Sequence, residues 1–201
     1  MRICVYAGSS VGRSPVYREA AHALGTLLAE EGIGLVYGGG SIGLMGVVAD
    51  AVLAHGGEVI GVITQALDGF GLSHAKLTEL RVVPTMHERK AAMAELSDGF
   101  IALPGGIGTL EEIFEAWTWS QLGVHAKPIA FLNAGGFYDR LSQFLDHVVE
   151  EQFLKAVHRN VLIVESDPCA LLAALRDTPV PYVPKWLDKV AVEAAVGTPK
   201  K

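Results

Sequence analysis

One stretch of the chain, residues 97–112 (SDGFIALPGGIGTLEE), constrains the fold more than any other. Phe100 to Leu103 is an apolar run of strand length, too short for a buried helix. A loop almost free of side chains follows at 104–108, and Thr109 then precedes Glu112 with the spacing of a helix capping box. Because unpaired N–H groups and the positive end of a helix dipole point to one place, this strand, loop and helix start predict a site for an anion, with phosphate as the first choice.

Two parts of this stretch also have simpler explanations. Gly105, Gly106 and Gly108 could form a tight turn between strand and helix with no ligand, although a turn needs fewer glycines. Glu112 could serve only to close the capping box. The sequence leaves both alternatives open.

Apolar runs of strand length alternate with helical segments along the chain. We expect strands near 2–7, 33–37, 58–63, 80–83, 100–103, 129–133 and 161–164, and a long loop over 64–78. This alternation predicts an α/β fold with a Rossmann-like, doubly wound, mostly parallel sheet of about seven strands flanked by helices. The length of 201 residues suits one domain over 1–176, followed by a C-terminal arm over 177–201.

A second glycine loop, residues 38–43 (GGGSIG), matches the spacing of the dinucleotide-binding fingerprint. The acidic residue that should end the next strand and hold a ribose is missing, because that strand ends in Ile63-Thr64-Gln65. No loop closes with Gly-Lys-Ser/Thr, so the chain is not a P-loop nucleotidase. These loops suit a mononucleotide or a sugar phosphate better than NAD.

Two cations, Arg89 and Lys90, fall in the first turn of a helix expected over 86–96. Cations there oppose the helix dipole at a cost of roughly 0.3–1 kcal/mol each. They could form a solvated charge pair with Glu88, or they could face an anion held by the glycine loops. On the helix expected from Thr109, Trp119 lies opposite the apolar face, which suggests a contact beyond the monomer's own core, with a ligand or a second subunit.

Composition excludes several classes of function. The net charge of −6 argues against a protein that coats nucleic acid or anionic membrane. No apolar run approaches the ~18 residues of a membrane span, and the N-terminus lacks a signal peptide. The two cysteines, Cys4 and Cys169, sit in apolar contexts and are expected to be buried free thiols, as suits a cytoplasmic protein. The histidines show no spacing typical of a metal site.

With these residues in place, the chain resembles the Lonely Guy family, the cytokinin riboside 5′-monophosphate phosphoribohydrolases. The matching motifs are Pro-Gly-Gly-x-Gly-Thr-x-x-Glu at 104–112 and Met-x-x-Arg-Lys at 86–90, and the resemblance covers about residues 2–176. It implies a homodimer or higher oligomer that cleaves the N-glycosidic bond of a nucleoside 5′-monophosphate, without cofactor or metal. The products are the free base and ribose 5-phosphate.

The resemblance also implies roles for individual residues. Arg89 and Glu112 occupy the catalytic positions. The positions implied to bind substrate are Ser9, Gly39, Gly40, Ser41, Lys90, Gly105, Gly106, Ile107, Gly108, Thr109, Leu110, Glu111 and Thr118.

Three functions remain open on the sequence. The substrate could be a cytokinin riboside monophosphate with AMP as a second substrate, or AMP could be preferred, or the chain could bind nucleotide without turnover. The label of lysine decarboxylase, often given to this family, requires pyridoxal phosphate on a lysine. Lys76, Lys90 and Lys127 lie in a loop, a helix start and a strand entry, and none is placed for a Schiff base.

Overall fold

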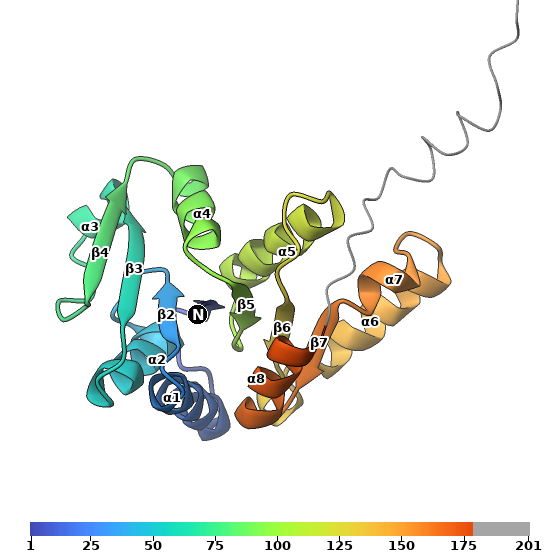
Figure 1. Ribbon diagram of the computed structural model, residues 1–201, viewed down its shortest axis with the longest axis horizontal. Helices are drawn as coiled ribbons and strands as arrows, with labels where there is room; N and C mark the ends of the chain where they lie inside the picture. Colours follow the sequence, from blue (N-terminus) through green and yellow to red (C-terminus); the bar gives the residue numbers. More distant parts are fainter. Residues whose placement is uncertain (179–201) are drawn as a thin grey trace, which may run out of the picture.

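The structure, a computed structural model, describes residues 1–178 and centres on one parallel sheet (Figure 1). Its seven strands are ordered β4-β3-β2-β1-β5-β6-β7, and every neighbouring pair is parallel. This confirms the predicted Rossmann-like α/β fold. The strands are β1 (Arg2–Tyr6), β2 (Gly34–Tyr37), β3 (Val59–Thr64), β4 (Glu79–Val83), β5 (Gly99–Ala102), β6 (Ile129–Leu132) and β7 (Leu162–Glu165).

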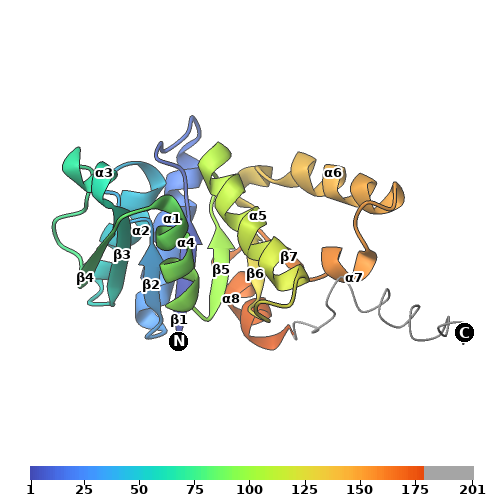
Figure 2. The same ribbon diagram turned by 90° about the horizontal axis from the view of Figure 1, so that it is seen from above.

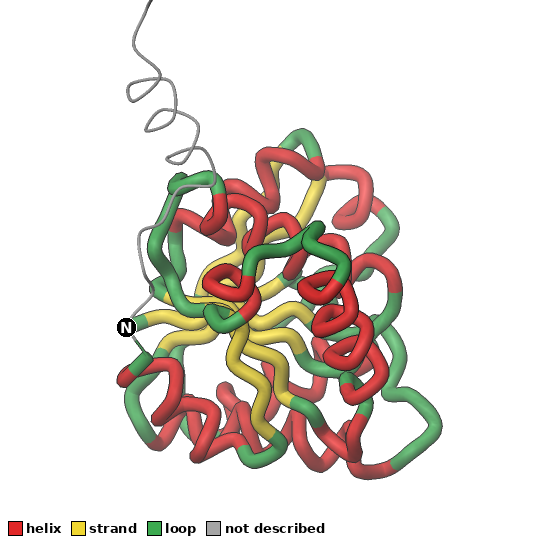
Figure 3. Tube along the Cα trace, turned by 90° about the vertical axis from the view of Figure 1, so that its right-hand side faces the viewer, coloured by secondary structure: helices red, strands yellow, loops and turns green. Residues whose placement is uncertain are grey.

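Helices cover both faces of the sheet (Figures 1 and 3). One face carries α1 (Pro15–Glu30), α2 (Gly43–Ala54) and α8 (Pro168–Asp177). The other carries α4 (Met86–Glu95), α5 (Ile107–Gln121) and α6 (Asp139–Glu150). Three short helices, α3 (Gln65–Gly69), η1 (Ala134–Gly136) and α7 (Ala156–Arg159), lie in the connections.

The alternation of side chains along each strand divides the core into two layers. In β1, Ile3 and Val5 pack under α1, α2 and α8, whereas Cys4 and Tyr6 pack under α4, α5 and α6. Both faces of the central strands are buried, which explains why their sequences are continuous apolar runs.

The order of the strands places a crevice between β1 and β5. The chain leaves β1 toward β2 by way of α1, but it leaves β5 toward β6 by way of α5 on the opposite face. The loops that follow β1 and β5 therefore diverge at the carboxyl edge of the sheet, and ligands of doubly wound folds bind at such a point. Figure 2 shows α4 and α5 side by side in front of the central strands.

Some local predictions were wrong. Residues 64–78, expected as a loop, contain α3, which Thr64 caps by accepting a hydrogen bond from the Leu67 N–H at 3.4 Å. Cys4 is buried, but Cys169 is exposed because it lies in the first turn of α8, on the side away from the sheet. The predicted arm over 177–201 lies, from residue 179 on, outside the described residues. Within 1–178, no helix combines the length and the apolar character needed to cross a bilayer.

Candidate active site

The loops after β1 and β5 meet at the crevice. The Gly8 N–H donates to the Pro104 carbonyl at 3.1 Å, and the Leu44 N–H at the start of α2 donates to the Gly8 carbonyl at 2.9 Å. Three segments distant in sequence thus form the floor of one site.

Helix α5 begins earlier than the sequence suggested. Its N-cap is Gly106 in extended conformation, with no side-chain cap, so Thr109 lies inside the first turn and the capping box predicted for Thr109 and Glu112 is wrong. A capping hydroxyl is instead found at α4, where Thr85 accepts a hydrogen bond from the Glu88 N–H at 3.2 Å. Because no side chain caps α5, its first N–H groups are left to donate hydrogen bonds to an anion.

The glycines of this loop serve two different purposes. A Cβ on Gly105 would lie 2.1 Å from Thr109 Oγ1 and 2.9 Å from the Gly8 nitrogen, so the close approach of the loops requires glycine there. A Cβ on Gly106 or Gly108 would meet no described atom within 4 Å, and neither residue has a positive φ. The fold therefore does not require glycine at 106 or 108. The alternative that the glycines only form a tight turn between strand and helix does not explain these two positions.

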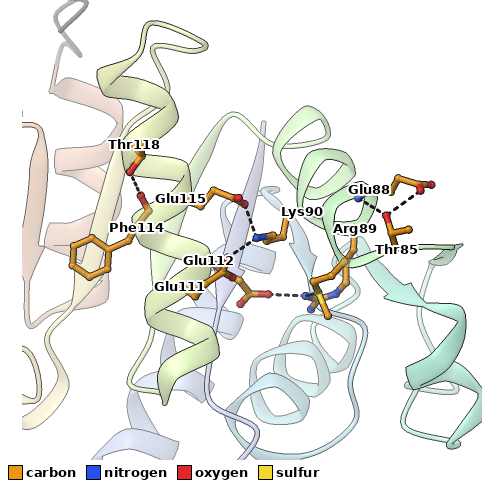
Figure 4. A network of polar contacts seen from close by, with 10 residues as sticks. Thr85, Glu88, Arg89, Lys90, Glu111, Glu112, Phe114, Glu115 and Thr118 are labelled. Carbon is orange, nitrogen blue, oxygen red and sulfur yellow. Dashed lines mark hydrogen bonds and ion pairs between the residues drawn. The ribbon is translucent and has the colours of Figure 1, made fainter.

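Arg89 on α4 and Glu112 on α5 face each other (Figure 4). Arg89 Nη1 lies 2.6 Å from Glu112 Oε1, and the two side chains are 8% and 13% exposed. Arg89 Nε also donates to the Val62 carbonyl at 2.9 Å, which fixes the guanidinium against the end of β3. Glu112 therefore does not close a capping box. It forms a partly buried ion pair with Arg89, and the desolvation cost of such a pair is repaid only by good geometry and further hydrogen bonds.

Burial raises the pKa of the Glu112 carboxyl above its ordinary value, although the charge and the hydrogen bond of Arg89 act in the opposite direction. A carboxylate with a raised pKa accepts a proton more readily than an ordinary glutamate does. The position beside the crevice makes Glu112 a candidate general base.

The cleft itself holds about 280 Å³ and has the ion pair on one wall and the α5 N-terminus on another. It brings together seven of the residues predicted from the sequence: Ser9, Arg89, Gly106, Ile107, Gly108, Thr109 and Glu112. Ala7, Gly8 and Met45 complete its lining. Gly105 lines an adjoining apolar hollow of about 230 Å³ that shares Gly8, Ser9 and Gly106 with the cleft.

Other predicted substrate positions lie away from this cleft. Lys90 is paired with Glu111 and Glu115 on α5. Leu110 packs against the core, and Thr118 is exposed, with its hydroxyl donating to the Phe114 carbonyl at 2.7 Å. Figure 4 shows Thr118 farther along α5, well separated from the Arg89–Glu112 pair.

The loop at 39–41 is occupied by a neighbouring segment of the chain. Gly39 accepts a hydrogen bond from the His74 N–H, Ser41 donates its N–H to the Leu72 carbonyl, and Gly40 forms an isolated bridge with Ser73. The side chain of His74 is in turn 3.0 Å from Asp50 on α2. The fingerprint-like glycines at 39 and 40 therefore hold the segment after α3, and they are not among the residues that line the cleft.

Sequence reasoning missed two contributors. Gly38 lies against the guanidinium of Arg89, and Met45 lines the cleft from α2. A glycine directly after a buried strand is a signal for close approach, but the sequence does not show that the approaching group is Arg89. Trp119, predicted to lie opposite the apolar face, is partly buried and packs against the core under α4, α5 and α6, and its contact with a ligand or second subunit stays a prediction.

Comparisons with known proteins show what this chain is similar to. Residues 45–175 match the family described as possible lysine decarboxylase. The cytokinin riboside 5′-monophosphate phosphoribohydrolase LOG of Oryza sativa subsp. japonica is 49% identical over 92% of this chain and 75% of that protein. LOG1 of Arabidopsis thaliana, with the same activity in its name, is 47% identical over 94% of this chain and 87% of that protein.

A solved structure shares the fold. The molybdenum cofactor binding protein of Rippkaea orientalis aligns with a TM-score of 0.66 at 26% identity, over 88% of this chain and 97% of that one.

Proposed function

Because this chain belongs to the Lonely Guy family of cytokinin riboside 5′-monophosphate phosphoribohydrolases, we propose that it hydrolyses the N-glycosidic bond of such nucleotides. The products are the free base and ribose 5-phosphate. The observation that carries the proposal is the partly buried Arg89–Glu112 pair, 2.6 Å apart, in the same cleft as the N-terminus of α5, which has no side-chain cap.

The 5′-phosphate binds at the start of α5. The first N–H groups of this helix and its dipole favour an anion, and Gly106 and Gly108 leave room for one to approach the backbone. Ser9 and Thr109 also line this part of the cleft and supply hydroxyl groups. Binding at this end places the sugar beside Glu112, one turn farther along the helix.

Glu112 then acts on the sugar. As the bond between C1′ and the base nitrogen breaks, its electron pair goes to the base and positive charge builds on the ribose. The Glu112 carboxylate stabilises this charge and takes a proton from the water whose oxygen bonds to C1′, while the departing base takes up a proton. Arg89 holds Glu112 in position and favours its ionised form.

The hydrolysis written above assigns no step to a metal or a cofactor. Residues 1–178 contain no group of three or more metal-ligating side chains placed to hold an ion. The decarboxylase label of the matching family would require a lysine amine free to form a Schiff base. Lys90 is paired with two carboxylates and Lys127 Nζ donates to the Ala94 carbonyl at 2.7 Å, so neither offers such an amine.

The test separates the three functions left open by the sequence. The protein is incubated with isopentenyladenosine monophosphate and, separately, with AMP, and the free base and ribose 5-phosphate are quantified by chromatography. Faster release of isopentenyladenine supports the proposal, and faster release of adenine indicates a nucleosidase that prefers AMP. Binding of both nucleotides without any release would identify a binding module and contradict the proposal.

The proposal extends to a cytoplasmic homodimer or higher oligomer that binds no nucleic acid. Leu122 and Val124 are exposed apolar side chains directly after α5, and a second copy packed against this end of the helix would bury them. Light scattering at micromolar concentration checks the oligomer. A mass near the 21.3 kDa of one chain would contradict it.

A further inference from the structure

A second ion-pair cluster lies directly beside the Arg89–Glu112 pair and is unused by the mechanism above. Lys90 follows Arg89 on α4, and its Nζ lies 2.5 Å from Glu111 Oε1 and 3.0 Å from Glu115 Oε2 on α5. Figure 4 shows the two cations on α4 pointing at consecutive carboxylates on α5. Helices α4 and α5 are thus joined at two adjacent positions.

Lys90 is the more buried partner in its cluster. Its side chain is 6% exposed, whereas Glu111 is 51% and Glu115 is 25% exposed. Burial lowers the pKa of Lys90, and the hydrogen bonds and charges of Glu111 and Glu115 more than offset this, so the net pKa is raised. The ammonium is therefore a fixed positive charge, and it does not line the cleft that holds Arg89 and Glu112.

Several charged and titratable groups influence the ionisation of Glu112. From α4, Arg89 and Lys90 favour ionised Glu112, and on α5 itself Glu111 opposes it. Cys4 and Tyr6 on β1 also interact electrostatically with Glu112, but burial raises the pKa of Cys4 to about 12 and that of Tyr6 well above its ordinary value, so both stay neutral. Lys90 is thus the group that neutralises the carboxylate adjacent to Glu112.

We propose that Lys90 is a positioning residue, which fixes α5 against α4 and cancels the charge of Glu111, so that Glu112 stays ionised and aligned with the sugar. The proposal rests on the hydrolase function proposed above. It differs from the role implied by the resemblance, in which Lys90 contacts substrate.

The test uses Lys90→Met, which keeps the apolar stem and removes the charge, and Lys90→Arg, which keeps the charge. For Lys90→Met we expect kcat to fall roughly 10- to 100-fold, as misplacement of a catalytic group does, with little change in KM. The acidic limb of the pH profile should move to higher pH, because Glu111 is then uncompensated. Lys90→Arg should retain most of kcat, and adding Glu111→Gln to Lys90→Met should return the acidic limb toward its original position.

The matched control is Arg159→Met. Arg159 is 16% exposed and joins α7 to Asp146 on α6 at 2.8 Å, so its loss removes a comparable ion pair between helices away from the cleft. This variant should keep both kcat and the pH profile. A raised KM with an unmoved acidic limb in Lys90→Met would overturn the proposal and assign Lys90 to substrate contact.

A second measurement is independent of activity. The carboxyl carbon of Glu112 is titrated by NMR in protein labelled on glutamate, without nucleotide, and is assigned with Glu112→Gln. The titration midpoint of Glu112 should rise in Lys90→Met. An unchanged midpoint overturns the proposal about Lys90, whereas absence of base release by the unsubstituted protein overturns the hydrolase function instead.

Discussion

A Cβ on Gly38 would lie 2.1 Å from Nη2 of Arg89, so the guanidinium occupies the space that any other residue at position 38 would fill. Arg89 cannot move aside without cost, because its Nε is bonded to the Val62 carbonyl and its Nη1 to Glu112. The glycine after β2 therefore supports the position of Arg89, although it does not itself line the cleft.

Gly38→Ala should displace Arg89 and break its alignment with Glu112. We expect kcat to fall roughly 10- to 100-fold, as misplacement of a catalytic group by about 1 Å does. Gly69→Ala is the matched control, because a Cβ there meets no described atom within 4 Å, and it should leave kcat unchanged. Steady-state kinetics of both variants checks the prediction, and equal activity of the two would contradict it.

Glu112→Gln should lower turnover by roughly 10²–10⁴, because the change removes a charge and a base needed in the transition state. Nucleotide affinity should change little, since the phosphate binds at the α5 N-terminus. Single-turnover release of base, with binding measured separately, checks both values. Glu88→Gln, which keeps a polar side chain beside the α4 cap, is the control. Near-normal turnover of the Glu112 variant would remove this residue from the mechanism.

The raised pKa of Glu112 predicts a pH dependence of stability. Between the ordinary pKa and the raised one, the folded chain keeps a proton that the unfolded chain has lost, so the contribution of Glu112 to stability declines as pH rises. The melting temperature of the unsubstituted protein minus that of Glu112→Gln should therefore decrease from pH 4.5 upward. Calorimetry across this range measures the difference, and a difference that grows with pH would show that the pKa is lowered.

Gly108→Ala should act on stability and on binding in opposite directions. The residue lies in the first turn of α5, has no positive φ and has free space around it, so alanine should stabilise the helix by up to about 0.5–1 kcal/mol. The added methyl group should weaken binding of the nucleotide phosphate. Gly105→Ala is the contrasting variant, since its Cβ would collide with Thr109, and it should destabilise the fold. Chemical denaturation and calorimetric titration with AMP measure the two effects. Unchanged affinity in Gly108→Ala would place the phosphate elsewhere.

Much of the fold followed from local pattern. Buried parallel strands are short apolar runs between glycine turns, and all seven such runs form strands of the sheet. Periodicity does not show that β1 lies between β2 and β5, because strand order depends on contacts between distant segments. Only the resemblance to the Lonely Guy family predicted that Arg89 and Glu112 act together.

The errors have physical causes as well. Thr109 has the spacing of a capping residue, but the open glycine backbone moves the N-cap of α5 three residues earlier, to Gly106. Thr85 and Glu88 have the same spacing and do form a cap, so the pattern alone cannot decide between such positions. Gly39 and Gly40 resemble a ligand loop, yet the pairing with residues 72–74 uses their backbone groups, and this pairing depends on a fold that the local sequence does not encode.

The contact between Gly8 and Pro104 joins loops that lie almost half the chain apart. Such a contact forms only when both halves of the sheet have docked. The chain loses conformational entropy when the long loop between the two residues closes, before the contact itself contributes any stabilising free energy. A nascent chain whose synthesis has not reached Glu112 lacks the carboxylate proposed to be catalytic. Its loops after β1 and β5 have also not yet met to form the floor of the crevice. Retention on an immobilised nucleotide monophosphate therefore reports completed folding, and it distinguishes native molecules from compact intermediates that already have most of their helices.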